Sequence, residues 1–240
     1  MAEPGDRPDD LAGPEDLVVL VHGLGRSYRS MARLERHLRR AGYRTRNWDY
    51  PSRRFSLAGL IALFHDYIEA AARPGQTVHF VGHSLGGLII RGALLRPVGC
   101  RIGRIVMIGT PNRGAGIVDR LGHTFLPEFI FGPSIRELGR EAATLKALGV
   151  PTAEIGIIAG TGRWHPFNPS SYINALVLRD ADHDGTVEVE STRLDGMADF
   201  LAVPYNHTFI HLQPDVIGQV VHFLGSGQFK RVPAAEQGAA

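Results

Sequence analysis

The sequence predicts an α/β fold with a mostly parallel central sheet, helices on both faces and a helical insert. Two observations carry this prediction. Short apolar runs typical of strands buried on both faces recur along the chain, and amphipathic segments of helical period separate them. With 240 residues, 44% of them hydrophobic, the chain is long enough for one domain with a sizeable core. We expect that domain at 17–224, between disordered tails at 1–16 and 225–240.

The first elements alternate between strand and helix. The run at 17–21 is continuously apolar, and the segment at 43–50 alternates, so we expect a buried strand and an edge or half-buried strand. Apolar residues recur at helical spacing after a possible N-cap at Ser27 or Ser30, and again over 57–72. This alternation calls for right-handed crossovers and parallel strands.

The stretch 78–91 reads VHFVGHSLGGLIIR, which is an apolar strand, a sharp turn and a helix. G-x-S-x-G in this setting is typical of a nucleophile elbow, where the serine occupies a strained turn and the glycines let neighbouring backbone pack closely. Ser84 Oγ would then stand exposed at the carboxyl edge of the sheet. The N–H of Leu85 begins the following helix and would supply half of an oxyanion site.

With this GHSLGG motif the chain resembles the α/β-hydrolase superfamily, in particular its bacterial serine esterase and lipase branch. The resemblance covers about 17–224 and implies an α/β-hydrolase fold that needs no cofactor. It also implies that the loop His22-Gly23-Leu24-Gly25, after the first strand, supplies the second oxyanion donor through the N–H of Leu24. His22 is a further candidate for the catalytic base, but by analogy we expect it to hold this loop by hydrogen bonding.

Further buried strands are expected at 104–108 and 155–159, and the turn GTPNRG after the first of them again resembles bacterial lipases and esterases. The segment 115–150 has no strand pattern, and long connections of this kind are often functional. We interpret 115–150 as a cap over Ser84 with a helix near 134–148, although ordinary core packing is an alternative. Its aromatic-rich run would line an acyl pocket with Phe125, Leu126, Phe129, Ile130 and Phe131.

The loop DADHDGTV at 180–187 offers three acids. A hydrolase of this type needs its acid between the serine and the histidine in chain order. D-G-x-V resembles the acid motif of the lipase branch and selects Asp184, with Asp182 as the alternative. Asp180, Asp182 and Asp184 also match the first half of an EF-hand loop, but Ser191 stands where a bidentate glutamate is required, so we predict no metal site.

The catalytic histidine should lie in a loop before the final helix, which we expect at 214–224. His207 in VPYNHT occupies that place and is the predicted base. His211 is the second choice, because it lies nearer the helix. His222 falls inside the helix, on a face that is solvated or packed.

Together these features predict a serine carboxylic-ester hydrolase that works through an acyl-enzyme on short to medium acyl esters, whether small molecules or lipids. Triacylglycerol lipase, thioesterase and acyltransferase activities use the same residues and remain alternatives. A non-catalytic binding module usually lacks a triad member, and this chain has a candidate for each.

Composition narrows the partners and the location. The net charge is only +2, with arginines interleaved among acids, which speaks against a nucleic-acid surface. Cys100 is the only cysteine, so no intrachain disulfide is possible. We find neither a leader nor an apolar run long enough to cross a membrane, and expect a cytoplasmic protein. The oligomeric state is not predicted.

Overall fold

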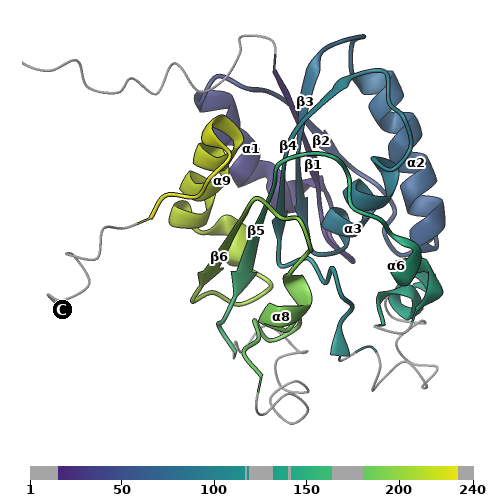
Figure 1. Ribbon diagram of the computed structural model, residues 1–240, viewed down its shortest axis with the longest axis vertical. Coiled ribbons are helices and arrows are strands. Elements are labelled where there is room, and N and C mark those ends of the chain that lie inside the picture. Colours follow the sequence, from purple (N-terminus) through teal and green to yellow (C-terminus); the bar gives the residue numbers. More distant parts are fainter. Residues whose placement is uncertain (1–15, 117, 119–131, 140–141, 164–180, 232–240) are drawn as a thin grey trace, which may run out of the picture.

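The computed structural model describes residues 16–116, 118, 132–139, 142–163 and 181–231. Its centre is a six-stranded, wholly parallel sheet with the order β2-β1-β3-β4-β5-β6 (Figure 1). The strands are β1 (Leu17–Val21), β2 (Arg44–Trp48), β3 (Thr77–His83), β4 (Arg101–Ile108), β5 (Ile155–Gly160) and β6 (Asp199–Val203). The predicted fold class is confirmed, and β2 is an edge strand as expected.

Helices cover both faces of this sheet (Figure 1). Helices α2 (Leu57–Ala71) and α3 (Leu85–Ala93) lie on one face. On the other lie α1 (Ala32–Arg40), which follows the 3-10 turn η2 (Tyr28–Met31), and α9 (Pro214–Ser226). Ser56 begins α2 as a side-chain cap, since its Oγ accepts a hydrogen bond of 3.1 Å from the N–H of Gly59.

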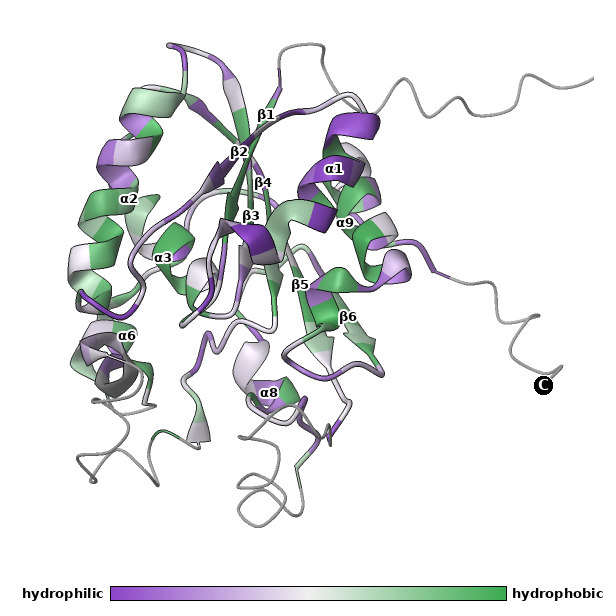
Figure 2. Cartoon of the chain, turned by 180° about the vertical axis from the view of Figure 1, so that it is seen from behind, coloured by the Kyte–Doolittle hydropathy of each residue, from purple (hydrophilic) through white to green (hydrophobic). Residues whose placement is uncertain are grey.

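The sheet separates two hydrophobic cores. Val19 of β1 packs into the core beneath α2 and α3, whereas its neighbour Val18 packs into the core beneath α1 and α9. Successive side chains of a strand point to opposite faces, so a strand buried on both sides must be apolar throughout. In Figure 2 the inner strands β1 and β5 accordingly carry mostly hydrophobic colours, whereas the edge strand β2 and parts of α1 are hydrophilic.

Two parts of the structure differ from the expected elements. In place of one helix near 134–148 there are two short ones, η3 (Pro133–Leu138) and α6 (Ala143–Ala147). Gly139 follows η3 with an extended backbone, φ −68° and ψ 153°, which ends the helical run. The prediction also lacked β6 and the short helix α8 (Val189–Thr192).

The packed part of the chain is longer at both ends than the predicted 17–224. Helix α9 continues to Ser226, Gly227 adopts a left-handed conformation, and the ring of Phe229 packs 4.9 Å from that of Phe223. At the other end the backbone carbonyl of Asp16 accepts a hydrogen bond of 3.1 Å from the N–H of Arg44. The described contacts thus extend to Asp16 at one end of the domain and beyond Ser226 at the other.

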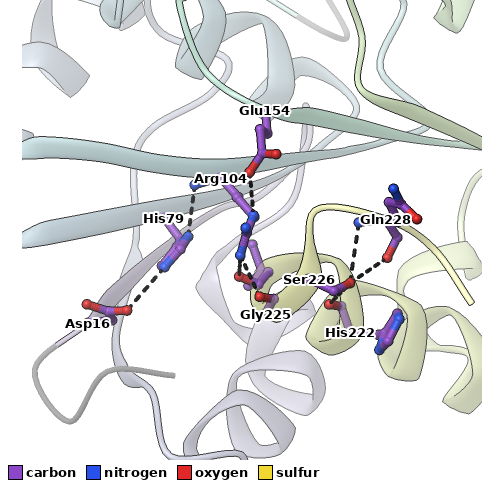
Figure 3. Close-up of polar contacts among 9 residues, drawn as sticks. Asp16, His79, Arg104, Glu154, His222, Gly225, Ser226 and Gln228 are labelled. Atoms are coloured by element: carbon purple, nitrogen blue, oxygen red, sulfur yellow. Dashed lines mark hydrogen bonds and ion pairs between the residues drawn. The ribbon is translucent and has the colours of Figure 1, made fainter. Parts of the chain in front are cut away.

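Polar contacts join several segments at the edge of the sheet where the parallel strands begin (Figure 3). The carboxylate of Asp16 lies 3.5 Å from Nε2 of His79, and Nδ1 of His79 accepts a hydrogen bond from the N–H of Arg104. The Arg104 guanidinium in turn donates to the last carbonyls of α9 and to Glu154. Within the described part of the chain, no helix is long and apolar enough to span a membrane.

Candidate active site

The backbone at Ser84 is strained in the way that the elbow motif predicts. Ser84 has φ 54° and ψ −122°, and it is the only non-glycine residue with positive φ among those described. It joins the end of β3 directly to the start of α3. A Cβ at Gly82 would lie 2.5 Å from the nitrogen of Gly87, and one at Gly86 only 2.2 Å from the carbonyl oxygen of Val21. Only glycines let the strand and the helix approach this closely.

Three predicted residues from distant parts of the chain meet at this turn. Nε2 of His207 lies 2.9 Å from the half-buried Ser84 Oγ, and its Nδ1 lies 2.7 Å from Oδ2 of Asp184. Because an ionised carboxylate can only accept a hydrogen bond, Nδ1 of His207 carries the proton. Nε2 is then free to accept the proton of Ser84, which is the arrangement of a nucleophile and its oriented base.

The Asp184 carboxylate is held rigidly in this position. It is fully buried, and its second oxygen, Oδ1, accepts hydrogen bonds of 2.9 and 2.7 Å from the N–H groups of Thr186 and Val187. The backbone N–H of His207 also donates to the carbonyl of Asp184 at 2.9 Å. Gly109, with φ 58°, lies directly against the pair, since a Cβ there would be 3.2 Å from Nδ1 of His207. The turn Gly109-Thr110-Pro111 thus packs against His207 and Asp184 from one side.

The alternative acid lies elsewhere. Asp182 is exposed and pairs with Arg163 at 3.0 Å, whereas Asp184 faces His207. The two carboxylates therefore do not converge as calcium ligands, and Asp180 lies outside the described residues. Among the described residues no group of three or more histidine, cysteine, aspartate or glutamate side chains could hold a metal ion.

The alternative base, His211, is buried behind the site, beside a histidine that the sequence analysis did not single out. The ring of His83 lies 4.3 Å from that of His211 and 5.0 Å from that of His207. Nε2 of His83 donates to the backbone carbonyl of His207 at 3.0 Å, so it fixes the loop that carries the base. The only sequence signal for this role is its position next to Ser84.

Burial keeps both of these histidines neutral. It lowers the pKa of His83 well below its usual value, and the repulsion that His211 and His207 exert in their protonated forms lowers this pKa further. Burial is also the main cause that lowers the pKa of His211 to about 4, with additional effects of His207 and Arg26. The ring of His211 packs on that of His83, which in turn packs on that of His207, and within the described structure His211 makes no hydrogen bond to Ser84.

The loop after β1 lies against the elbow, as the resemblance implies. A Cβ at Gly23 would be 3.2 Å from Cβ of Ser84. The N–H groups of Leu24 and Leu85 have no hydrogen-bond partner among the described residues, whereas the N–H of Gly25 donates to Ser52 Oγ at 2.9 Å. Two amides next to Ser84 thus have N–H groups free to bind a negatively charged oxygen.

His22 stabilises this loop. Its Nδ1 lies 2.9 Å from the carbonyl oxygen of Gly23, and its ring stacks on that of Tyr50 at 4.1 Å. The Tyr50 hydroxyl donates to the His22 carbonyl at 2.7 Å. Burial lowers the pKa of His22, against the opposing effects of the Gly23 carbonyl and Asp49. These contacts fit a residue that holds the loop.

The five predicted pocket residues, Phe125 to Phe131, lie outside the described residues. The described end of the insert is anchored by Arg91 of α3, a buried arginine. Its guanidinium donates to the backbone carbonyls of Leu148 and Gly149 at 2.5 and 2.6 Å, and to that of Asn112 at 2.9 Å. The segment after α6 is thereby fixed to the helix that follows Ser84.

Comparisons with known proteins agree with this geometry. A family model described as the alpha/beta hydrolase family matches residues 18–225. The mature lipase BlEst2 of Bacillus licheniformis has a similar structure, with a TM-score of 0.75, 16% identity and coverage of 93% of this chain and 96% of that one. A metagenomic carboxyl esterase has a TM-score of 0.65 and 17% identity, covering 82% of this chain and 66% of its own.

A third similar structure is the product of the gene lin2722 from Listeria innocua, with a TM-score of 0.60, 15% identity and coverage of 90% of this chain and 96% of that one. None of the curated proteins matches the sequence. At identities this low, the similarity to these structures shows only that the fold is shared.

Proposed function

Because the chain belongs to the alpha/beta hydrolase family, we propose that it is a serine hydrolase that cleaves carboxylic esters, with Ser84, Asp184 and His207 as its catalytic triad. The observation that carries this proposal is the continuous pair of contacts from Ser84 Oγ through His207 to Asp184, 2.9 and 2.7 Å long. The fold is also that of proteins described as a lipase and a carboxyl esterase.

The reaction follows from these contacts. Ser84 Oγ attacks the ester carbonyl carbon while His207 Nε2 takes the hydroxyl proton, and Asp184 stabilises the imidazolium that forms. The tetrahedral intermediate places its negative oxygen against the N–H groups of Leu24 and Leu85. On collapse, His207 returns the proton to the departing alcohol. A water molecule then attacks the acyl-enzyme by the same route and releases the acid.

We propose short to medium acyl esters as the substrates. Hydrolysis of triacylglycerol, hydrolysis of thioesters and acyl transfer to an alcohol use the same intermediate and are the alternatives. They differ in the group that accepts or carries the acyl chain, so a substrate series separates them.

The test is the hydrolysis of p-nitrophenyl esters from acetyl to palmitoyl, with an acyl thioester and an emulsified triacylglycerol as further arms. Wild type is compared with Ser84→Ala, His207→Ala and Asp184→Asn. Removing a triad member in a hydrolase of this type lowers kcat by roughly 10⁴ to 10⁶-fold, so we expect all three variants to be nearly inactive with KM little changed.

Asp182→Asn is the matched control, because it removes a neighbouring exposed carboxylate whose ion-pair partner among the described residues is Arg163. It should retain wild-type kcat. Covalent labelling by a fluorophosphonate, located by mass spectrometry, should occur at Ser84 in wild type and be absent in Ser84→Ala. An inert wild type across all substrates, or full activity in Asp184→Asn, would contradict the proposed triad.

A further inference from the structure

The turn 51–54 borders the loop 22–25, called the oxyanion loop below, and the two form an open hollow of about 250 Å³. The hollow is lined by Gly25 of that loop and by Pro51, Ser52, Arg53 and Arg54. It is smaller than the roughly 300–1,000 Å³ of pockets that enclose a whole drug-sized ligand, so it suits one end of a substrate. No residue of the proposed triad lines it.

Arg53 holds its guanidinium directly over the oxyanion loop. A Cβ at Gly25, where φ is +68°, would lie 2.8 Å from Nη2 and 3.2 Å from Nε of Arg53. The guanidinium thus packs on the bare face of this glycine while remaining exposed to solvent. Any other residue at position 25 would push it away.

The backbone of the turn is well fixed. The Ser52 hydroxyl accepts the N–H of Gly25, the N–H of Ser52 donates to the Tyr50 carbonyl at 2.9 Å, and the N–H of Arg54 donates to the Pro51 carbonyl at 2.9 Å. Gly132 lies against the Arg53 carbonyl, since a Cβ there would be 2.1 Å from it. Arg53 is therefore carried by a turn that is clamped on two sides.

The guanidinium groups of Arg53 and Arg54 have no hydrogen-bond or ion-pair partner among the described residues. Nearby carboxylates are engaged elsewhere. Asp49 accepts the N–H of Tyr28 at 3.1 Å, and Glu137 accepts from the N–H of Leu57 and the hydroxyl of Thr144. Exposed guanidinium donors without a carboxylate partner favour an anion, and the planar fork of arginine matches carboxylate and phosphate oxygens.

The hollow lies within reach of an ester at Ser84. Gly23 contacts Ser84, and Gly25 follows two residues later, so Ser84 and the Arg53 guanidinium are on the order of 10 Å apart. An aromatic spacer or a short chain covers that span. From this geometry we propose that the turn 51–54 binds a carboxylate or phosphate group of the substrate, with Arg53 as its main contact. The inference rests on the proposed ester hydrolysis and narrows its substrates to anionic esters.

The first test compares esters that differ only in charge. 4-Acetoxybenzoate and 4-acetoxyphenyl phosphate carry an anion on the leaving group, and 4-acetoxybenzamide is their neutral counterpart. Mono-p-nitrophenyl glutarate carries the anion on the acyl side, with p-nitrophenyl valerate as its neutral counterpart. We expect wild type to prefer at least one anionic ester by about tenfold in kcat/KM, mainly through KM. The preferred compound shows whether the turn binds a carboxylate or a phosphate. It also shows whether that anion belongs to the acyl group or to the leaving group.

Arg53→Gln should remove this preference and leave the neutral esters within about twofold of wild type. Arg53→Lys should keep part of it, because lysine retains the charge but lacks the planar fork. Arg36→Gln is the matched control, since Arg36 is an exposed arginine on α1. In 1 M salt, where the screening length is about 3 Å, the wild-type preference should narrow. Equal changes in Arg53→Gln for charged and neutral esters would overturn the proposal.

Direct binding separates this inference from the proposed function. Isothermal titration calorimetry with benzoate and with phenyl phosphate requires no turnover. We expect about tenfold weaker binding in Arg53→Gln than in wild type and Arg36→Gln for the anion that binds. If wild type cleaves neutral esters but binds neither anion, the anion subsite is wrong and the hydrolase proposal stands. If wild type binds an anion through Arg53 but cleaves no ester, the anion subsite stands and the hydrolase proposal is wrong.

Discussion

At the scale of single residues, the elbow depends on glycines whose missing side chains let three backbone segments meet. The Cβ that Gly86 lacks would lie 2.2 Å from the Val21 carbonyl oxygen, and the one that Gly87 lacks would lie 2.0 Å from Thr110 Oγ1. The first contact is with backbone, which cannot swing aside as a flexible side chain can. Helix α3 can therefore pack directly against β1 because Gly86 lacks a methyl group.

Gly86→Ala should force α3 away from β1 and displace Ser84. We expect a loss of about 1–3 kcal/mol in the free energy of unfolding, as for other overpacked cores, and a fall in ester hydrolysis of roughly 100-fold from misplacement of the nucleophile. Urea unfolding and p-nitrophenyl ester kinetics measure the two effects.

Gly218→Ala is the control for this substitution. Gly218 lies in α9, and a Cβ there would meet no atom within 4 Å. Alanine is the better helix former, so this variant should be as stable as wild type or up to about 1 kcal/mol more stable, with unchanged activity. Equal stability of Gly86→Ala and wild type would show that β1 and α3 can separate without cost.

At the scale of elements, the last helix is held to the sheet at its carboxyl end by one arginine. Nη1 of Arg104, on β4, donates to the carbonyls of Leu224 and Gly225 at 2.9 and 2.6 Å, and its Nε donates to Glu154 at 2.7 Å (Figure 3). Carbonyls in the last turn of a helix have no partner inside the helix, and a cation there also opposes the negative end of its dipole.

Arg104→Ala should lower the free energy of unfolding by about 1–3 kcal/mol, because it leaves the two carbonyls without this donor. Arg101→Ala on the same strand is the control. Arg101 is exposed, and within the described part of the chain its guanidinium donates only to the Thr77 hydroxyl, so its removal should change stability by less than about 0.5 kcal/mol. Hydrogen exchange of α9 amides should rise in Arg104→Ala. Unchanged exchange there would contradict an anchoring role.

At the scale of the whole molecule, the fold buries several histidines that must stay neutral. Burial is the largest cause that lowers the pKa of His22, His79, His83, His183 and His211. At pH values below the pKa of such a histidine in the unfolded chain, the unfolded chain binds more protons than the folded protein. Its contribution to stability is present above pH 6.5 and is lost as the pH falls, so the molecule should be sensitive to acid.

His211 makes this dependence measurable. Its pKa is about 4 in the folded state and 6.5 in the unfolded reference, a difference that corresponds to about 3 kcal/mol lost between those two pH values. We expect urea midpoints of wild type to fall steeply over this window and those of His211→Leu to fall less. Parallel curves for the two proteins would show that His211 does not contribute.

The sequence alone determined the features that depend on neighbouring residues. An apolar run predicts a buried strand, and G-x-S-x-G between a strand and a helix predicts a strained elbow, because period and backbone strain are local properties. The α/β class, the elbow at Ser84 and the order of the motifs follow in this way. The weak, partly exposed strand β6 escaped prediction because its burial comes from pairing with β5 and not from its own pattern.

The tertiary structure decided which distant residues meet. The D-G-x-V motif favours Asp184 and leaves Asp182 as the alternative, and the packing of their loop turns Asp184 toward His207 and Asp182 toward Arg163. The same holds for His83 beneath the His207 loop and for Arg53 over Gly25. These contacts join segments separated by tens to more than a hundred residues, and the order of strands in the sheet, which no local pattern encodes, brings them together.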